Sequence, residues 1–250
     1  MGLQCMVGVE MTFTLKQGDC LELMKELPDN SIDLIVTSPP YDNLRDYNNS
    51  SKYSMNRTLS GMYDKIKLGG VVIWIISDQT IDGSESGSSF RSALYAKEIG
   101  FNLHDTMIYL KDMRYPDDIR YSSAFEYMFV FSKGKPKTFN PIKRNPLWRG
   151  KNKVVTNRNK DGHMTAARYS SPQMSTGPNV FYYSTGYGKS AKEDYIFEHP
   201  AIFPEQLAWD QIYSWSDKDD IILDPFMGSG TTGVAALRLI LIISRLQRNV

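Results

Sequence analysis

Short apolar runs alternate with segments of helical periodicity over the first 132 residues, and this alternation constrains the fold more than any other feature. The run GVVIWIIS at 70–77 is continuously apolar, as expected for a strand that is covered on both faces. Alternation of this kind predicts an α/β fold with a doubly wound, mostly parallel sheet and helices on both faces. The predicted strands are 12–19, 32–36, 70–77, 103–111 and 125–133, and the predicted helices are 20–27, 59–67 and 88–101.

The pattern fails between residues 134 and 198, where polar residues, glycine and proline dominate without any sustained period. A connection of that length without structure is uncommon in a compact domain, so it is predicted to be an irregular insertion with a role of its own. Order returns with a helix at 203–216 and a strand, turn and helix at 220–239. The predicted units are therefore 1–133, 134–198 and 199–250.

The net charge of +1 conceals a strong asymmetry. From Lys133 to Glu198 there are 13 Lys or Arg against 4 Asp or Glu, whereas the rest of the chain has 16 against 24. A basic block on an acidic body indicates a surface that faces a polyanion. A solvated loop region that happens to be basic is the alternative.

Other features of the sequence exclude several classes of protein. Cys5 and Cys20 form no disulfide framework and no zinc-binding spacing, which favours a reducing cytoplasm and no metal site. No apolar run reaches the ~20 residues that a membrane span needs. The first residues lack the pattern of a secretory signal, and Met11 is an alternative start.

Two turns carry residues that are suited to chemistry. In DLIVTSPPYDNL, at 33–44, two prolines must end the apolar strand, and the rigid turn carries the Ser38 hydroxyl and the Tyr41 ring. In DPFMGSGTT, at 224–232, a carboxylate and a Gly-x-Gly turn stand between a strand and a helix. The glycines let the backbone approach a ligand, and the carboxylate can bind a hydroxyl or ammonium group. The spacing matches neither the dinucleotide fingerprint nor the P-loop.

GDCLELMKELPDNSIDLIVTSPPYDNL, followed much later by DPFMGSGTTGVAAL, resembles the DNA amino-methyltransferases of the β arrangement, which occur in restriction–modification systems. The resemblance extends from about 14 to 238, except for the insertion. It implies a Rossmann-like methyltransferase fold, S-adenosylmethionine as the cofactor and double-stranded DNA as the substrate. Residues 1–133 would be the catalytic half, 134–198 the target-recognition insertion, and 199–250 the cofactor-binding half.

The resemblance also assigns roles to individual residues. The catalytic turn would be Ser38, Pro39, Pro40 and Tyr41. Asp19 would approach the cofactor adenine, although a helix N-cap is its alternative role. The methionine part of the cofactor would be held by Asp224, Pro225, Phe226, Gly228, Ser229, Gly230, Thr231 and Thr232. The basic candidates for DNA contacts are Lys143, Arg144, Arg149, Lys151, Arg158 and Arg168.

The chemistry of the reaction explains the catalytic turn. An exocyclic base amine is a poor nucleophile because its lone pair is delocalised into the ring. The Ser38 hydroxyl and the Pro39 carbonyl are rigid acceptors that can draw the nitrogen toward tetrahedral geometry. The target base must leave the duplex, and Tyr41 offers a face for it to stack on. No side-chain nucleophile is needed.

Several alternatives remain open at the level of sequence. Ser-Pro-Pro-Tyr favours cytosine N4 as the target, with adenine N6 as the alternative. Residues 238–250 contain no acid where the family holds the cofactor ribose, so a truncated DNA-binding pseudo-enzyme is a further alternative. A small-molecule or protein methyltransferase fits the basic insertion poorly. The resemblance also leaves open a cognate restriction endonuclease that acts on the same site and a homodimer. It implies a prokaryotic or phage origin.

Overall fold

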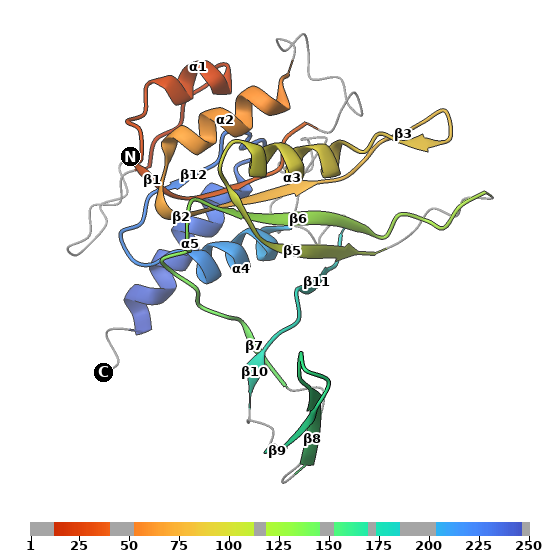
Figure 1. Ribbon diagram of the computed structural model, residues 1–250. Coiled ribbons are helices and arrows are strands. Elements are labelled where there is room, and N and C mark those ends of the chain that lie inside the picture. The colour runs from red at the N-terminus through yellow and green to blue at the C-terminus, as the bar shows by residue number, and fades with distance from the viewer. Residues whose placement is uncertain are drawn as a thin grey trace.

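The computed structural model describes residues 13–40, 53–112, 119–145, 153–169, 174–185 and 204–246. Its centre is a six-stranded sheet, whose strands stand in the order β11-β5-β6-β2-β1-β12 (Figure 1). Every neighbouring pair is parallel except those of β6, which runs antiparallel to β2 and to β5. The predicted mostly parallel α/β sheet is therefore confirmed. The strands are β1 (Ile32–Thr37), β2 (Ile66–Ile76), β5 (Asn102–Lys111), β6 (Phe125–Ser132), β11 (Val180–Tyr183) and β12 (Ile222–Leu223).

Helices cover both faces of this sheet and divide the core into two apolar clusters. Side chains alternate between the faces, so Leu34 and Ile73 join the cluster beneath one pair of helices, while Ile35 and Trp74 join the other cluster. Trp74 is fully buried, as expected for a core residue. Burial of each large apolar side chain contributes roughly 1.5–3 kcal/mol. One face carries α1 (Cys20–Lys25), α2 (Met55–Lys65) and α3 (Ser88–Glu98), and the other carries α4 (Glu205–Trp215) and α5 (Thr231–Leu246).

The first predicted strand is wrong over its described part. Residues 13–18 form no strand, and the side chains of Phe13 and Leu15 are 50% and 61% exposed. An apolar–polar alternation yields a strand only where a neighbouring strand supplies hydrogen-bond partners. The segment instead leads into α1, whose N-cap is Asp19.

The basic insertion contains more regular structure than its sequence indicates. Near its root, β7 (Lys143–Arg144) pairs with β10 (Ser175–Thr176). Farther out, β8 (Lys153–Arg158) and β9 (Met164–Tyr169) form an antiparallel hairpin that stands away from the central sheet (Figure 1). The chain then returns to add β11 to the edge of the sheet beside β5. Another short hairpin, β3 (Thr80–Ile81) and β4 (Ser84–Glu85), follows β2.

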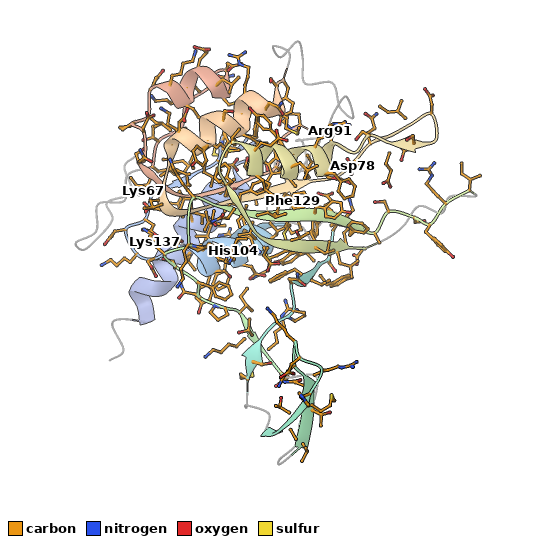
Figure 2. All side chains as sticks on the ribbon, in the orientation of Figure 1. Lys67, Asp78, Arg91, His104, Phe129 and Lys137 are labelled. Carbon is orange, nitrogen blue, oxygen red and sulfur yellow. The ribbon has the colours of Figure 1, made fainter. Side chains whose placement is uncertain are left out.

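The buried residue Asp33, at the amino end of β1, forms an ion pair with Lys137 at the root of the insertion. The Asp33 carboxylate is 2% exposed and accepts hydrogen bonds from Lys67 Nζ at 2.7 Å and Lys137 Nζ at 2.5 Å. The Ile221 amide donates a further bond at 3.0 Å. Figure 2 shows Lys67 and Lys137 on one side of the molecule and Asp78 on the opposite side. Burial acts to raise the pKa of Asp33, but these hydrogen bonds outweigh it and the pKa is lowered.

We expect Asp33→Asn to lower the free energy of unfolding by about 1–3 kcal/mol at pH 7, because it removes charge-assisted hydrogen bonds to partly exposed lysines. Since the folded pKa lies below the unfolded value, this contribution is present above about pH 4 and is lost as the pH falls through the folded pKa. Urea unfolding of both proteins at pH 7 and pH 3 measures it. A difference that does not shrink at pH 3 would assign the effect to packing instead of charge.

Candidate functional site

The two turns that were singled out in the sequence lie side by side. Strands β1 and β12 are parallel neighbours, with Leu34 opposite Ile222 and Ile35 opposite Leu223. Both strands therefore end at the same edge of the sheet, and each turn begins there. The site lies outside the carboxyl ends of the strands, which is where open α/β sheets place their ligands.

A hydrogen-bond cluster centred on Asp224 joins the two turns. The hydroxyl of Thr37, the last residue of β1, donates to Asp224 Oδ1 at 2.6 Å, and the Phe226 amide donates to the same atom at 3.0 Å. The hydroxyl of Thr232, in the first turn of α5, donates to Oδ2 at 2.6 Å. Burial raises the pKa of the Asp224 carboxyl, although these three hydrogen bonds oppose the shift.

Sequence reasoning missed Thr37. Its side chain is completely buried, and its hydroxyl is the direct link between the catalytic turn and the glycine turn. The only signal in the sequence was a polar residue at the end of an otherwise apolar strand, immediately before Ser-Pro-Pro. Its partner lies so far along the chain that no local pattern could have identified the contact.

The glycine turn offers space and polar groups for a ligand. Gly228 and Gly230 have φ values of 52° and 88°, a conformation that disfavours residues with a side chain. A Cβ added to Gly230 would meet no other atom within 4 Å, so the space beside the turn is open. The hydroxyls of Ser229 and Thr231 lie 3.2 Å apart at the start of α5. A carboxylate has about four acceptor positions, so the three hydrogen bonds of Asp224 within the described residues leave one position for an ammonium group.

These groups fit the methionine part of S-adenosylmethionine. Its carboxylate matches the hydroxyls and the helix N-terminus, and its ammonium matches the partly buried Asp224 carboxylate. The residues of the predicted cofactor turn, from Asp224 to Thr232, thus form one compact cluster.

Tyr53 and Phe13, two aromatic residues that sequence reasoning did not single out, stand beside the same turn. The rings of Tyr53 and Phe226 meet edge to face, with their centroids 5.7 Å apart. A Cβ added to Gly233 would lie 2.9 Å from the Phe13 ring, so this ring packs directly on the start of α5. Both aromatics come from segments whose sequences gave no indication of proximity to the turn.

The remaining catalytic and cofactor candidates fall into two groups. Ser38 and Pro40 are half-buried and Pro39 is buried at the end of β1, whereas Tyr41 lies outside the described residues. Asp19 is the N-cap of α1, where its Oδ1 accepts from the amides of Leu21 at 2.8 Å and Glu22 at 3.2 Å. The alternative role of Asp19 is therefore present, and its approach to the cofactor adenine stays a prediction.

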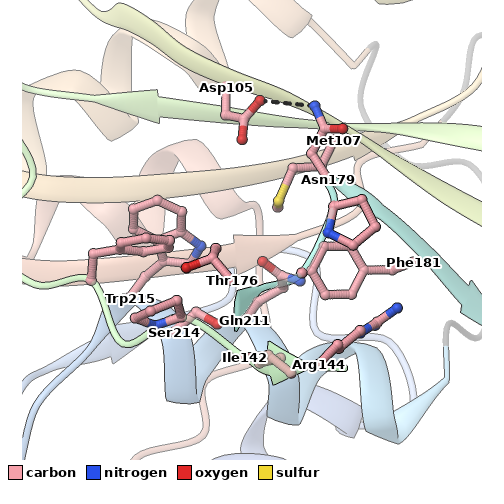
Figure 3. A pocket seen from close by; sticks show the side chains of 14 residues that line it. Asp105, Met107, Ile142, Arg144, Thr176, Asn179, Phe181, Gln211, Ser214 and Trp215 are labelled. Atoms are coloured by element: carbon pink, nitrogen blue, oxygen red, sulfur yellow. Dashed lines mark hydrogen bonds between the residues drawn. The ribbon is translucent and has the colours of Figure 1, made fainter. Parts of the chain in front are cut away.

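The candidate DNA contacts that the structure describes lie at two places along the insertion. Lys143 and Arg144 form β7, and Arg158 ends β8. Arg149, Lys151 and the side chain of Arg168 lie outside the described part. A cavity of about 80 Å³ lies at the root of the insertion, and Figure 3 shows the side chains that line it. There the Cζ atom of Arg144 lies 5.2 Å from the centroid of the Phe181 ring. Arg144 therefore packs against the protein as well as facing solvent.

Comparison with known proteins agrees with this arrangement. The family model described as DNA methylase, of the N6 and N4 type, matches residues 32–240. The chain is 50% identical over 220 residues to the orphan methyltransferase M.BamHII of Bacillus amyloliquefaciens, covering 85% of this chain and 83% of that protein. It is 25% identical over 231 residues to the type II methyltransferase M.BglII of Bacillus subtilis, covering 89% and 61%.

Two solved structures share the fold. The PvuII DNA methyltransferase (cytosine-N4-specific) superposes with a TM-score of 0.61 at 24% identity, covering 88% of this chain and 76% of that one. The complex of M1.HpyAVI with SAM superposes with a TM-score of 0.54 at 21% identity, covering 88% and 86%. The match of the family model over most of the chain, together with the M.BamHII relative, shows that this chain belongs to the S-adenosylmethionine-dependent amino-methyltransferases of DNA.

Proposed function

We propose that this DNA amino-methyltransferase transfers a methyl group from S-adenosylmethionine to N4 of a cytosine that is flipped out of duplex DNA. The observation that carries the proposal is the hydrogen bond from Thr37 to Asp224, which fixes a base-facing turn and a cofactor-facing turn against each other. Methyl transfer between two bound molecules needs this juxtaposition, because its rate depends on the alignment of the reacting atoms.

In this mechanism the catalytic turn acts on the amine of the base. The Ser38 hydroxyl and the Pro39 carbonyl accept hydrogen bonds from the two amine protons and localise the lone pair on nitrogen. Tyr41 stacks on the base and compensates for part of the stacking that is lost on flipping. When bound, S-adenosylmethionine supplies an electrophilic methyl group, and the protein supplies position and electrostatics.

The cofactor-facing turn holds the other reactant. We assign the ammonium of the methionine part to Asp224, and its carboxylate to the hydroxyls of Ser229 and Thr231 and the first amides of α5. Thr37 and Thr232 keep the Asp224 carboxylate in one orientation, since each donates to a different oxygen atom. The Phe13 ring, which packs on Gly233, and the Tyr53–Phe226 pair add apolar surface beside this turn.

The choice of cytosine rests on Ser38, because adenine-N6 enzymes that resemble this chain usually carry Asp or Asn at that position. Incubation of the purified chain with duplex DNA and S-adenosylmethionine, followed by mass analysis of the digested nucleosides, tests the choice. N4-methylcytosine is expected. N6-methyladenine would establish the alternative base, and the absence of both products would refute methyl transfer by this chain.

The kinship with an orphan methyltransferase supports an enzyme that works without a cognate restriction endonuclease. The same incubation, carried out with this chain as the only protein, tests whether methylation needs a partner protein.

We expect the basic insertion to carry most of the DNA affinity. Replacing Lys143, Arg149 and Lys151 by Gln should lower the slope of log affinity against log salt by ~0.9 for each phosphate contact that is lost. Arg144 is left in place because its guanidinium packs on Phe181. Titrations of fluorescent duplex DNA at several salt concentrations give the slopes.

The matched control replaces three exposed lysines outside the insertion by Gln, namely Lys25, Lys97 and Lys218. The control changes the net charge by the same amount. Equal slopes for the two triple variants would place the DNA-binding surface elsewhere.

A further inference from the structure

The hairpin of β8 and β9 is a two-stranded ribbon whose described side chains are exposed on both faces. Its strands pair from Lys153 opposite Tyr169 to Arg158 opposite Met164. In Figure 1 it stands apart from the sheet at the far end of the insertion. An isolated two-stranded hairpin is marginally stable in water at best, so this geometry indicates a ribbon that is made to lie against something else.

The composition of the ribbon points to nucleic acid as its partner. Residues 153–169 contain four Lys or Arg against one Asp. A two-stranded β-ribbon also has the dimensions to enter the major groove of B-DNA, where each base pair shows a distinct pattern of donors and acceptors. The charge of the ribbon and its shape therefore both favour duplex DNA as its partner.

One face of the ribbon carries groups that can read bases. The register places Val154, Thr156 and Arg158 on the same face as Met164 and Ala166. Val154 and Met164 are 56% and 61% exposed, although both are apolar. In a major groove, apolar groups and threonine methyls contact the methyl group of thymine, and arginine binds guanine O6 and N7 with two hydrogen bonds.

Arg158 lies at the tip of the ribbon, beside the turn that joins β8 and β9. The turn is closed by bonds from the Asn159 amide to the His163 carbonyl at 2.8 Å and from the Gly162 amide to the Asn159 carbonyl at 3.0 Å. Gly162 has a φ of 85°, and a Cβ added there would lie 4.0 Å from Arg158 Nη2. The guanidinium therefore lies beside the turn, at a point of the backbone that has no side chain of its own.

We propose that the β8–β9 ribbon enters the major groove and that Arg158 recognises one guanine of the target sequence through O6 and N7. This inference rests on the proposed function for its substrate, duplex DNA. It goes further by assigning sequence selection to one ribbon face and one side chain. Arg158 is here a specificity-determining residue and has no part in methyl transfer.

The first experiment measures which sequences the full chain binds, so it is independent of methylation. A pool of randomised duplexes is selected with the wild-type chain, Arg158→Ala and Lys160→Ala, and the bound sequences are counted. We expect wild type to enrich a sequence with a fixed guanine, and Arg158→Ala to lose preference at that single position by about 5- to 150-fold. The nearby Lys160→Ala is the matched control, and it should weaken all sequences alike without changing the preference.

The second experiment alters the DNA instead of the protein. Replacing the selected guanine by 7-deazaguanine removes the N7 acceptor from the major groove, whereas inosine removes only the minor-groove amine. Wild type should bind the 7-deazaguanine duplex more weakly and the inosine duplex normally. Arg158→Ala should not distinguish the three duplexes, since its contact is already gone.

The outcomes separate the two proposals. Uniform weakening of binding by Arg158→Ala would show that Arg158 contacts a phosphate. An unchanged sequence preference would show that Arg158 reads no base in the major groove. Either result overturns the inference. Enrichment of no sequence by wild type would also overturn it. If wild type selects a sequence but yields no methylated product, the proposed function fails while the reading of guanine by Arg158 is still decided by the two experiments.

Discussion

A Ser38→Ala chain is expected to methylate DNA about 100- to 1000-fold more slowly than wild type, with its affinities for DNA and cofactor almost unchanged. The Ser38 hydroxyl is proposed to hold the reacting amine as its nitrogen becomes tetrahedral, and such preorganised hydrogen bonds act mainly in the transition state. Single-turnover methylation with saturating S-adenosylmethionine measures the rate of the chemical step directly. Because Ser38 is only half-buried at the end of β1, the fold should tolerate alanine.

Two further variants define the origin of the loss. Ser84→Ala, in the β4 hairpin beyond the end of β2, is the matched control and should keep the wild-type rate. Tyr41→Ala should weaken capture of the flipped base, which stacking supports by ~1–3 kcal/mol. A wild-type rate for Ser38→Ala would remove that hydroxyl from the mechanism, and a wild-type rate for Tyr41→Ala would do the same for the ring.

Asp224→Asn should separate cofactor binding from stability. Loss of the carboxylate charge removes the partner proposed for the cofactor ammonium, so the affinity for S-adenosylmethionine should fall about 10- to 150-fold. Burial raises the folded pKa of Asp224, so its ionised form favours unfolding at neutral pH. The contribution of this carboxyl to folding is largest below the unfolded pKa and is lost as the pH rises through the folded pKa. At pH 7, asparagine removes this charge but offers only one acceptor oxygen to the two threonine hydroxyls, so the two effects oppose each other and the free energy of unfolding should change little.

Asp224→Ala provides the contrast, because it leaves the buried Thr37 hydroxyl without its acceptor and leaves the Thr232 hydroxyl only the Val36 carbonyl, at 3.4 Å. A buried hydroxyl without an acceptor costs roughly 1–3 kcal/mol, so the alanine variant should lose about that amount. Isothermal calorimetry and urea unfolding at pH 7 measure the two quantities. Wild-type affinity in Asp224→Asn would assign the carboxylate a purely structural role.

The sequence predicted β1, β2, β5, β6 and β12 of the sheet from local patterns, but it missed β11, which lies in the segment predicted to be irregular. The apolar runs around 32–36 and 70–77 became β1 and β2, since a strand that is covered on both faces must be apolar throughout. Residues 13–18 show the limit of this reasoning, because their alternation satisfies a strand pattern while no neighbouring strand supplies partners. Pairing is a property of the whole sheet, which a single segment cannot reveal.

The site was predicted in part for a related reason. Each of the motifs at 38–41 and 224–232 is one continuous stretch of sequence, so its residue types were enough to predict a base-binding turn and a cofactor-binding turn. The contact of Thr37 with Asp224 and the packing of Phe13 on Gly233 depend on chain segments that meet only in the folded protein. The β8–β9 ribbon escaped prediction because its described side chains are exposed, and hydrophobic periodicity indicates only elements that bury a face.

The order in which the ribosome releases the chain has a consequence for this site. The hydrogen bond between Thr37 and Asp224 spans 187 positions, and β12 pairs with β1 only after the entire insertion has been synthesised. Contacts between such distant positions form slowly, because a long loop must close before they contribute any stability. A nascent chain therefore exposes the insertion and the catalytic turn well before the glycine turn exists. Under the proposed function, the residues that hold the methyl donor are synthesised last, so chains that stall before β12 are expected to be inactive.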